Sequence, residues 1–173
     1  VMRGQGGSLN AVTLSLSRAE SISDTAIAAG EQVMKQLGAM KGVAAQAMSA
    51  GLTDDQRAAL QRQYQDQMQV LQTFVRNASF DESNILDGSQ PNGVSFIADA
   101  DATQTLTLEG RNFLPGGGVI VAMPSNTALN TTQSAADTQK LLDQSIANIG
   151  DQLASMTAER KRIEAQKGFV GKL

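Results

Sequence analysis

The chain has 173 residues, a formal net charge of -3 and no cysteine, histidine or tryptophan. These absences exclude thiolate and imidazole metal sites, cysteine nucleophiles and the Ser-His-Asp arrangement, and no carboxylate pair shows signs of tuning. Aromatic residues make up 3% of the chain, and no apolar run approaches the roughly 20 residues that span a bilayer. We therefore expect no catalytic residue, cofactor, metal, nucleic-acid partner or membrane partner.

Residues 1–173 fall within the size of one domain. Because the chain begins with Val1 and not with methionine, we expect it to be trimmed from a longer protein.

The first predicted element is a helix over residues 8–50, in which apolar positions recur every three or four residues. At about 1.5 Å per residue it would be roughly 60 Å long. Glycine weakens a helix, so Gly30, Gly38 and Gly42 are predicted where a second helix approaches closely. Gly51 is the predicted stop.

A second helix is predicted over residues 53–79. Thr53 and Gln56 have the spacing of a capping box, in which each side chain bonds the backbone of the other. An apolar face then follows at helical spacing. Its members are Leu60, Tyr64, Met68, Leu71, Val75 and Ala78.

The middle of the chain changes period, and we predict a small β element over residues 92–123. Turn residues separate three candidate strands, at 94–97, 105–108 and 119–122. Residues 99–103 contain two aspartates, but they lack the Gly and Glu that complete a calcium loop, so a solvated turn is favoured.

A third helix is predicted over residues 134–168, with an apolar four-three alternation interrupted by Arg160. The predicted fold is mainly α: an elongated antiparallel bundle, or coiled coil, of three long helices with a small β-hairpin element in the middle of the chain. The first and last helices pair, and the second packs along both. The predicted helix-packing core is Leu16, Val33, Leu37, Met40, Leu60, Leu71, Leu142, Ile149, Leu153, Met156 and Ile163.

These features resemble bacterial flagellin, in which a long helix from each end of the chain flanks a variable β-rich middle. Residues 79–88 are similar to the family's Phe-Asn-Gly, spacer, Leu-Leu-Asp-Gly segment. Residues 162–164 resemble its Asn-Arg-Leu-Glu block, with Lys161 in place of the Asn. The opening residues 1–5 and 8–10 look most like the short flagellins of alphaproteobacteria.

The resemblance implies a structural subunit of the extracellular flagellar filament that polymerises by self-association. It also implies the flagellar export and capping machinery as partners. Family members carry further terminal stretches that form the innermost layer of the filament. These stretches are not in this sequence, and we expect that polymerisation requires them.

A helix stretch of many flagellins, typically Gln-Arg-Val-Arg-Glu-Leu-Ala-Val-Gln-Ala, is sensed by an animal innate immune receptor. Residues 38–47 align with it, and the resemblance implies weak recognition because Ala39 and Lys41 replace its arginines and Gly42 replaces its glutamate. Val43 keeps an apolar position.

Three other functions are open. A hook-filament junction protein shares the paired terminal helices, and it would differ in its binding partners. A small adaptor or chaperone would carry a peptide in a groove and would show a contiguous exposed apolar patch. An enzyme is the third alternative.

Overall fold

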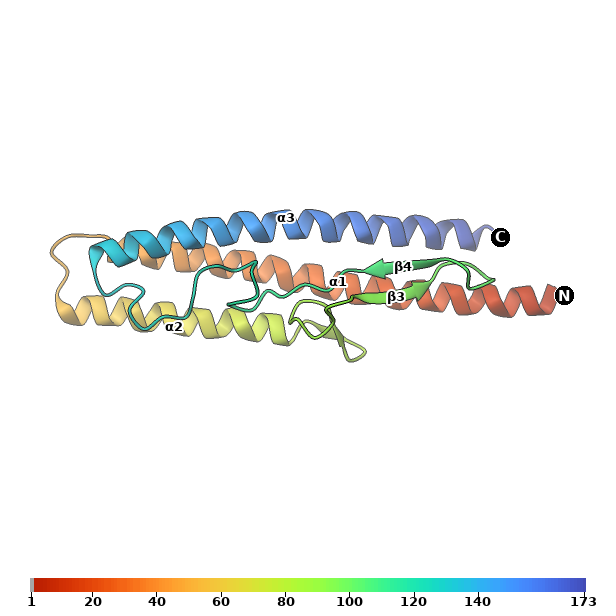
Figure 1. Cartoon of the computed structure of the whole chain (residues 1–173), viewed down its shortest axis with the longest axis horizontal. Helices are drawn as coiled ribbons and strands as arrows, with labels where there is room; N and C mark the ends of the chain where they lie inside the picture. Colours follow the sequence, from red (N-terminus) through yellow and green to blue (C-terminus); the bar gives the residue numbers. More distant parts are fainter. Residues whose placement is uncertain (1) are drawn as a thin grey trace.

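The computed structural model describes residues 2–173, with side chains from residue 7 onward, so the side chains of the opening motif at residues 1–5 lie outside the described part. Three long helices form a rod: α1 (Met2–Ala47), α2 (Asp54–Arg76) and α3 (Thr132–Gly171). Both α2 and α3 run antiparallel to α1, and the start of α1 lies at the same end of the rod as the end of α3 (Figure 1). The predicted fold class is confirmed. No helix in the described range is long and apolar enough to cross a membrane.

Both ends of α1 differ from the predicted range of residues 8–50. The helix has begun by Met2 and stops at Ala47. The Arg57 guanidinium donates to the carbonyl oxygens of Ala47 at 2.8 Å and Ser49 at 3.5 Å, so an α2 side chain satisfies carbonyls that the helix end leaves free. Gly51 has φ +82° and lies in the turn beyond the helix. It reverses the chain and does not stop the helix.

The predicted capping box at the start of α2 is confirmed. Thr53 Oγ1 accepts from the Gln56 backbone N–H at 3.1 Å, and Gln56 Oε1 accepts from the Thr53 N–H at 2.9 Å. The helix ends at Arg76, before the expected residue 79. Its apolar stripe packs against α1.

Two short hairpins follow α2. The first pairs β1 (Ser79–Phe80) with β2 (Ser83–Asn84), and it was not among the predicted elements. The second pairs β3 (Val94–Ile97) with β4 (Thr105–Leu108), as predicted. It lies beyond the end of α2, with β3 against α1 and β4 against α3, so it takes over the place of α2 in that half of the rod (Figure 1).

Residues 109–131, here called the return segment, run back from the hairpin between α2 and α3 (Figure 1). The prediction of a third strand at residues 119–122 is wrong. The Val121 and Ala122 N–H groups donate to an α3 hydroxyl instead of to another strand. The expectation that α2 packs along both other helices is also wrong over this length, where the return segment lies between α2 and α3. Then α3 starts at a Thr131–Ser134 capping box, earlier than the expected residue 134, and ends at Gly171.

The glycines of α1 behave differently from one another. A Cβ built on Gly30 would lie 2.7 Å from Leu153 Cδ2, so α1 and α3 approach closely there as predicted. Gly38 and Gly42 are exposed, and a Cβ on either would meet nothing within 4 Å. The close-approach prediction for these two is therefore wrong.

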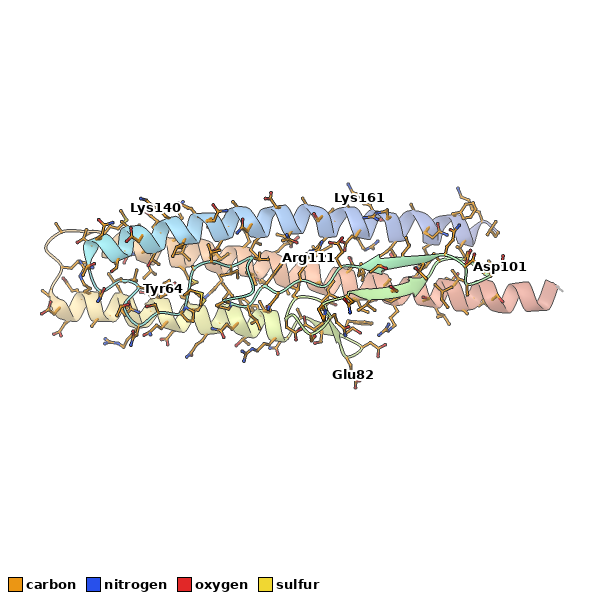
Figure 2. All side chains as sticks on the ribbon, in the orientation of Figure 1. Tyr64, Glu82, Asp101, Arg111, Lys140 and Lys161 are labelled. Carbon is orange, nitrogen blue, oxygen red and sulfur yellow. The ribbon has the colours of Figure 1, made fainter. Side chains whose placement is uncertain are left out.

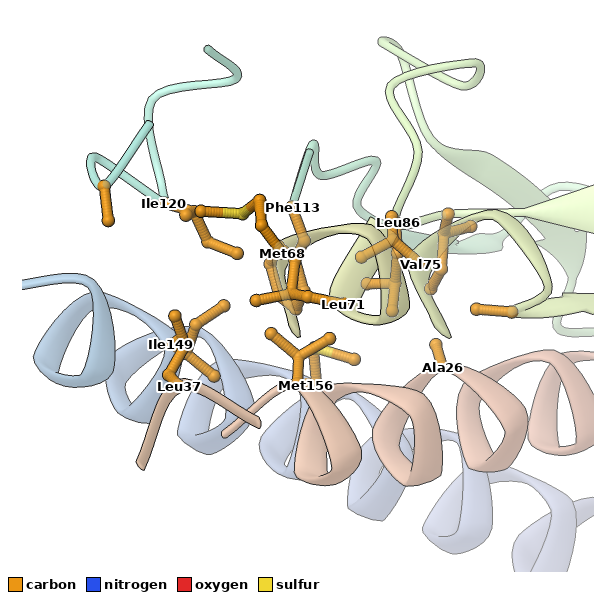
Figure 3. Packing of buried hydrophobic residues seen from close by; sticks show 14 of the residues in the cluster. Ala26, Leu37, Met68, Leu71, Val75, Leu86, Phe113, Ile120, Ile149 and Met156 are labelled. Atoms are coloured by element: carbon orange, nitrogen blue, oxygen red, sulfur yellow. The ribbon is translucent and has the colours of Figure 1, made fainter. Parts of the chain in front are cut away.

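One apolar core runs along the rod and includes side chains from all three helices and the return segment (Figure 3). Phe113 and Ile120 of the return segment are fully buried within it. Of the predicted packing residues, Leu60 and Leu153 are half-buried against this core. The others are buried: Leu16, Val33, Leu37, Met40, Leu71, Leu142, Ile149, Met156 and Ile163.

Candidate functional site

The side chains of α3 fall into three lines along the helix. The central line consists of buried apolar residues seven positions apart, a period that keeps one stripe of a helix facing its neighbours. Its members are Ala135, Leu142, Ile149, Met156, Ile163 and Val170. A second line faces α1, and a third faces the segment that precedes α3 in the chain.

The α1-facing line combines apolar contact with exposed or half-exposed charge. Leu153 lies against Gly30, and about two turns further along α3 Arg160 contacts Glu20 at 2.9 Å and Asp24 at 2.7 Å. The hydrogen bond to Asp24 raises the pKa of the Arg160 guanidinium, although partial burial opposes this. Arg160, which appeared to interrupt the seam in the sequence, therefore ties α3 to α1.

The third line is polar and binds the chain's middle, partly through backbone groups and partly through the Arg111 side chain. Thr138 donates to the Ala128 carbonyl at 2.8 Å. Ser145 Oγ accepts from two N–H groups of the return segment at 3.0 and 3.2 Å. Gln166 donates to the Ala98 carbonyl at 2.6 Å. The full line is Thr138, Ser145, Gln152, Glu159 and Gln166, again one residue every seven.

Arg111 of the return segment binds two neighbouring members of this polar line, Gln152 and Glu159. Its side chain is 4% exposed and forms a two-pronged pair with Glu159, with nitrogen–oxygen distances of 3.0 and 3.3 Å. Its Nε also donates to Gln152 Oε1 at 2.6 Å (Arg111 is labelled in Figure 2). Such a bidentate pair fixes orientation as well as charge. Arg111 thereby holds the return segment in one position along α3.

The opposite side of the return segment is bonded to α2. The Tyr64 hydroxyl donates to the Met123 carbonyl at 2.8 Å, and burial raises the pKa of Tyr64 to about 12. Gln61 donates to the Ser125 carbonyl at 2.8 Å and accepts from the Leu129 N–H at 2.7 Å. The segment has little regular structure, yet both flanking helices satisfy its backbone.

The flagellin-like motif at residues 79–88 links the end of α2 to this network. Asn84 Nδ2 donates to the Val75 carbonyl at 2.8 Å, which satisfies a free carbonyl at the helix end. Asn84 Oδ1 accepts from the Leu86 N–H at 2.8 Å, and the Ile85 carbonyl accepts from the Arg111 N–H at 2.7 Å. The motif is a structural joint.

The Asp99 carboxylate, considered for calcium, is occupied by donors of its own turn. It accepts from the Thr103 N–H at 2.8 Å and from the Thr103 hydroxyl at 2.6 Å, and the hydroxyl bond lowers the pKa of Asp99. Across the described residues, no three carboxylates gather as a metal site would require.

The hollows on the rod are shallow. One of about 440 Å³ lies at the α1–α2 turn, and no ionisable side chain lines it. Its lining residues are Gln46, Ser49, Leu52, Gln56, Ala59, Leu60 and Gln63. This lining offers no acid–base pair and no activated nucleophile.

The stretch aligned with the immune-receptor segment lies near the end of α1. Val43 is buried, whereas Ala39 and Gly42 are exposed. Lys41 is half-buried, and its Nζ lies 2.7 Å from Asp143 Oδ1 on α3. The charge of this stretch is therefore that of Lys41, which is already paired within the chain.

Comparison with known proteins agrees with this architecture. Residues 1–91 match the model of the bacterial flagellin N-terminal helical region. The chain belongs to the bacterial flagellin family. Flagellin FljJ of Caulobacter vibrioides is 34% identical over 84% of this chain and 52% of its own length. Flagellin FljM of the same organism is 31% identical over 96% of this chain and 59% of its own length.

This flagellin chain spans between half and three fifths of the length of those curated relatives. A crystal structure of Bacillus cereus flagellin has a similar fold, with a TM-score of 0.78 and 19% identity over 90% of this chain and 88% of that one. The flagellins are a structural family and not an enzymatic one.

The sequence predicted the apolar lines of this flagellin but not the polar line of α3. A signal was present, because polar residues recur every seven positions from Thr138 to Gln166 beside the apolar heptad. Polar side chains on a helix normally face water, so this repeat was not distinguished from a solvated face.

Proposed function

We propose that the chain is the core of a structural subunit of the bacterial flagellar filament, which polymerises by self-association outside the cell and catalyses nothing. The observation that supports this most is membership of the flagellin family, from the match of residues 1–91 and the Caulobacter relatives. The proposed partners are other copies of the chain and, during delivery and growth, the flagellar export and capping machinery.

The physical properties of the rod suit this role. The most deeply buried charged side chains, Arg111 and Glu159, are paired with each other within the chain and do not need an outside ligand. Side chains such as Lys140 and Lys161 point away from the rod (Figure 2). Copies that meet through two different patches of such a surface build an open helical polymer when the rotation between neighbours does not close into a ring.

The distribution of the protein along the flagellum separates this function from that of a hook-filament junction protein. Antibodies against this chain, with gold label and electron microscopy of intact flagella, should mark the whole filament. The control is a strain in which the gene is deleted, which should be unlabelled.

Labelling confined to the base of each filament would contradict the proposal and favour the junction protein. Unlabelled flagella in a strain that produces the chain would contradict both functions.

We also propose that the chain is a poor agonist of the animal receptor that senses flagellin. The resemblance assigns recognition to two arginines and a glutamate, whose places are taken by Ala39, Lys41 and Gly42. Arginine is a frequent hot-spot residue, and its truncation commonly costs 2 kcal/mol or more, so binding should fall on the order of a hundredfold.

Reporter cells carrying the receptor test this idea. A variant with Ala39→Arg, Lys41→Arg and Gly42→Glu should signal more strongly than the unchanged chain, and an exposed Lys35→Arg change should have no effect. Equal potency of the unchanged chain and a flagellin that keeps the full stretch would refute it.

A further inference from the structure

The turn between residues 90 and 93 contains an Asn-Gly step that has no role in the network described above. Of the eight asparagines in the sequence, Asn92 alone is followed by glycine. The Asn92 side chain is exposed and has no hydrogen-bond partner among the described residues. By contrast, the Asn84 amide is buried and bonded through both of its polar atoms.

We propose that Asn92 is a site of spontaneous deamidation that converts this position to aspartate and isoaspartate. The Gly93 backbone nitrogen attacks Asn92 Cγ and loses its proton to solvent. The bond from Cγ to Nδ2 breaks and ammonia leaves, which gives a five-membered succinimide. Water then opens either carbonyl of that ring. Both products carry one more negative charge than the starting chain.

Gly93 makes the attack possible because it has no side chain to shield its nitrogen. The fold restrains the reaction as well, since the Gly93 N–H donates to the Gln90 carbonyl at 2.9 Å and closes the turn. Attack requires this bond to open, so the rate reports opening of the turn.

The two products should differ in how well the fold accepts them. Aspartate keeps the backbone length, but isoaspartate adds a methylene to the main chain. The backbones around this turn are closely packed, so a longer main chain must displace them: a Cβ on Gly93 would lie 2.3 Å from the Leu108 carbonyl oxygen, and one on Gly110 would lie 1.5 Å from the Gln90 carbonyl oxygen. Gly93 also leads directly into the Val94–Leu108 pair of the β3–β4 hairpin. Isoaspartate therefore loosens the hairpin.

The neighbouring Asp87-Gly88 step provides an internal comparison. Asp87 Oδ1 accepts from the Ser89 N–H at 2.9 Å, and the Gly88 N–H donates to the Arg111 carbonyl at 3.0 Å. Its carboxyl group and the following nitrogen are both held, so this step should stay unchanged while Asn92 reacts.

The test is to age the whole chain at mildly alkaline pH and map it by mass spectrometry after digestion. Asn92 should convert before any other asparagine, including exposed Asn126, which precedes threonine. Conversion should be faster in urea, where the turn is open. An Asn92→Gln variant, whose longer side chain cannot form the five-membered ring, should keep its original charge on isoelectric focusing.

The Asn92→Asp variant separates charge from backbone lengthening. It should melt at nearly the temperature of the fresh chain, whereas the isoaspartate fraction of aged protein should melt lower. An Asn92 that stays intact while Asn126 converts would refute the modification site. Equal rates in urea and in buffer would refute the restraint by the turn, and equal melting of the two products would refute the effect on the hairpin.

Discussion

The two flanks of α3 hold the helix in different ways. The flank towards α1 uses an apolar side chain in a glycine notch, Leu153 at Gly30, together with ion pairs of the partly exposed Arg160. The flank towards the return segment uses one polar residue every seven, centred on the Arg111–Glu159 pair, whose side chains are 4% and 7% exposed. One flank resembles an ordinary coiled coil, and the other binds an irregular backbone.

The difference follows from what each flank meets. The backbone groups of a regular helix bond to one another, so α3 contributes only apolar packing and side-chain ion pairs to its contact with α1. The return segment has N–H and carbonyl groups without a strand partner, and leaving such groups buried and unpaired costs about 1–3 kcal/mol each. Polar side chains at heptad spacing supply the missing partners without interrupting the apolar core.

The largest expected effect comes from removing one member of the buried pair. Arg111→Met leaves the Glu159 carboxylate buried and uncompensated, which should lower the free energy of unfolding by about 3–5 kcal/mol. Urea denaturation followed by circular dichroism measures this. A matched change on the other flank, Arg160→Met, should cost about 1 kcal/mol or less, because Asp24 is exposed and Glu20 keeps the Lys167 ammonium at 2.8 Å.

Adding Glu159→Leu to the Arg111→Met variant should recover much of the loss, since a buried ion pair can often be replaced by apolar groups. If Arg160→Met proved as costly as Arg111→Met, the two flanks would not differ as described.

A second prediction concerns the α2 side of the return segment and uses pH. The pKa of Tyr64 rises from 10.0 in the unfolded chain to about 12 in the fold. The fold favours the neutral phenol. The stabilisation that this gives the folded state is complete below pH 10 and is lost as the pH rises through 12. The loss should approach roughly 3 kcal/mol, from about 1.4 kcal/mol per unit of pKa.

Tyr64 is the one tyrosine of the sequence, so absorbance at alkaline pH follows its ionisation directly. A Tyr64→Phe variant should lack this part of the alkaline loss and keep only the slope from lysines. Ionisation near pH 10 in the folded chain would contradict a buried hydroxyl donating to Met123.

The smallest expected effects separate the glycines of α1. Gly38→Ala and Gly42→Ala should each raise the free energy of unfolding by up to about 1 kcal/mol, because both sites are open and alanine favours helix. Gly30→Ala should bring no such gain, because its Cβ would lie 2.7 Å from Leu153 Cδ2.

In a Leu153→Ala background, Gly30→Ala should recover the gain of about 1 kcal/mol seen at the open sites. Urea titration of the four chains measures the coupling. Equal effects of alanine at all three glycines would show that α3 does not occupy a notch in α1.

Periodicity made most of the fold predictable from the sequence. The three helices, the start of α2 at Thr53 and the β3–β4 hairpin follow from local spacing and capping chemistry. The β1–β2 hairpin does not, because its turn places Asp81 and Glu82 at φ 51° and 65°, where glycine or asparagine is the usual signal. Glu82 stands at the projecting tip of this turn (Figure 2).

Two other failures have a common cause, which is that long-range partners decided the outcome. Residues 119–122 have the composition of a strand, but Ser145 of a distant helix takes up their N–H groups. Arg160 seemed to break a seam, yet it meets Asp24, 136 residues earlier in the chain. Local patterns contain no information about such partners.

Because α3 follows α1 and the return segment in the sequence, it constrains the order in which the rod can fold. Synthesis starts at the N-terminus, so α1 and Arg111 are made before α3. Glu159, which pairs with Arg111, follows it by 48 residues. Contacts this distant in sequence must overcome a large loop-closure entropy, and they are associated with slow folding. A nascent chain that ends before α3 therefore still lacks the main packing partner of α1 and the buried counter-charge of Arg111, and the rod closes only when the forty residues of α3 have been made.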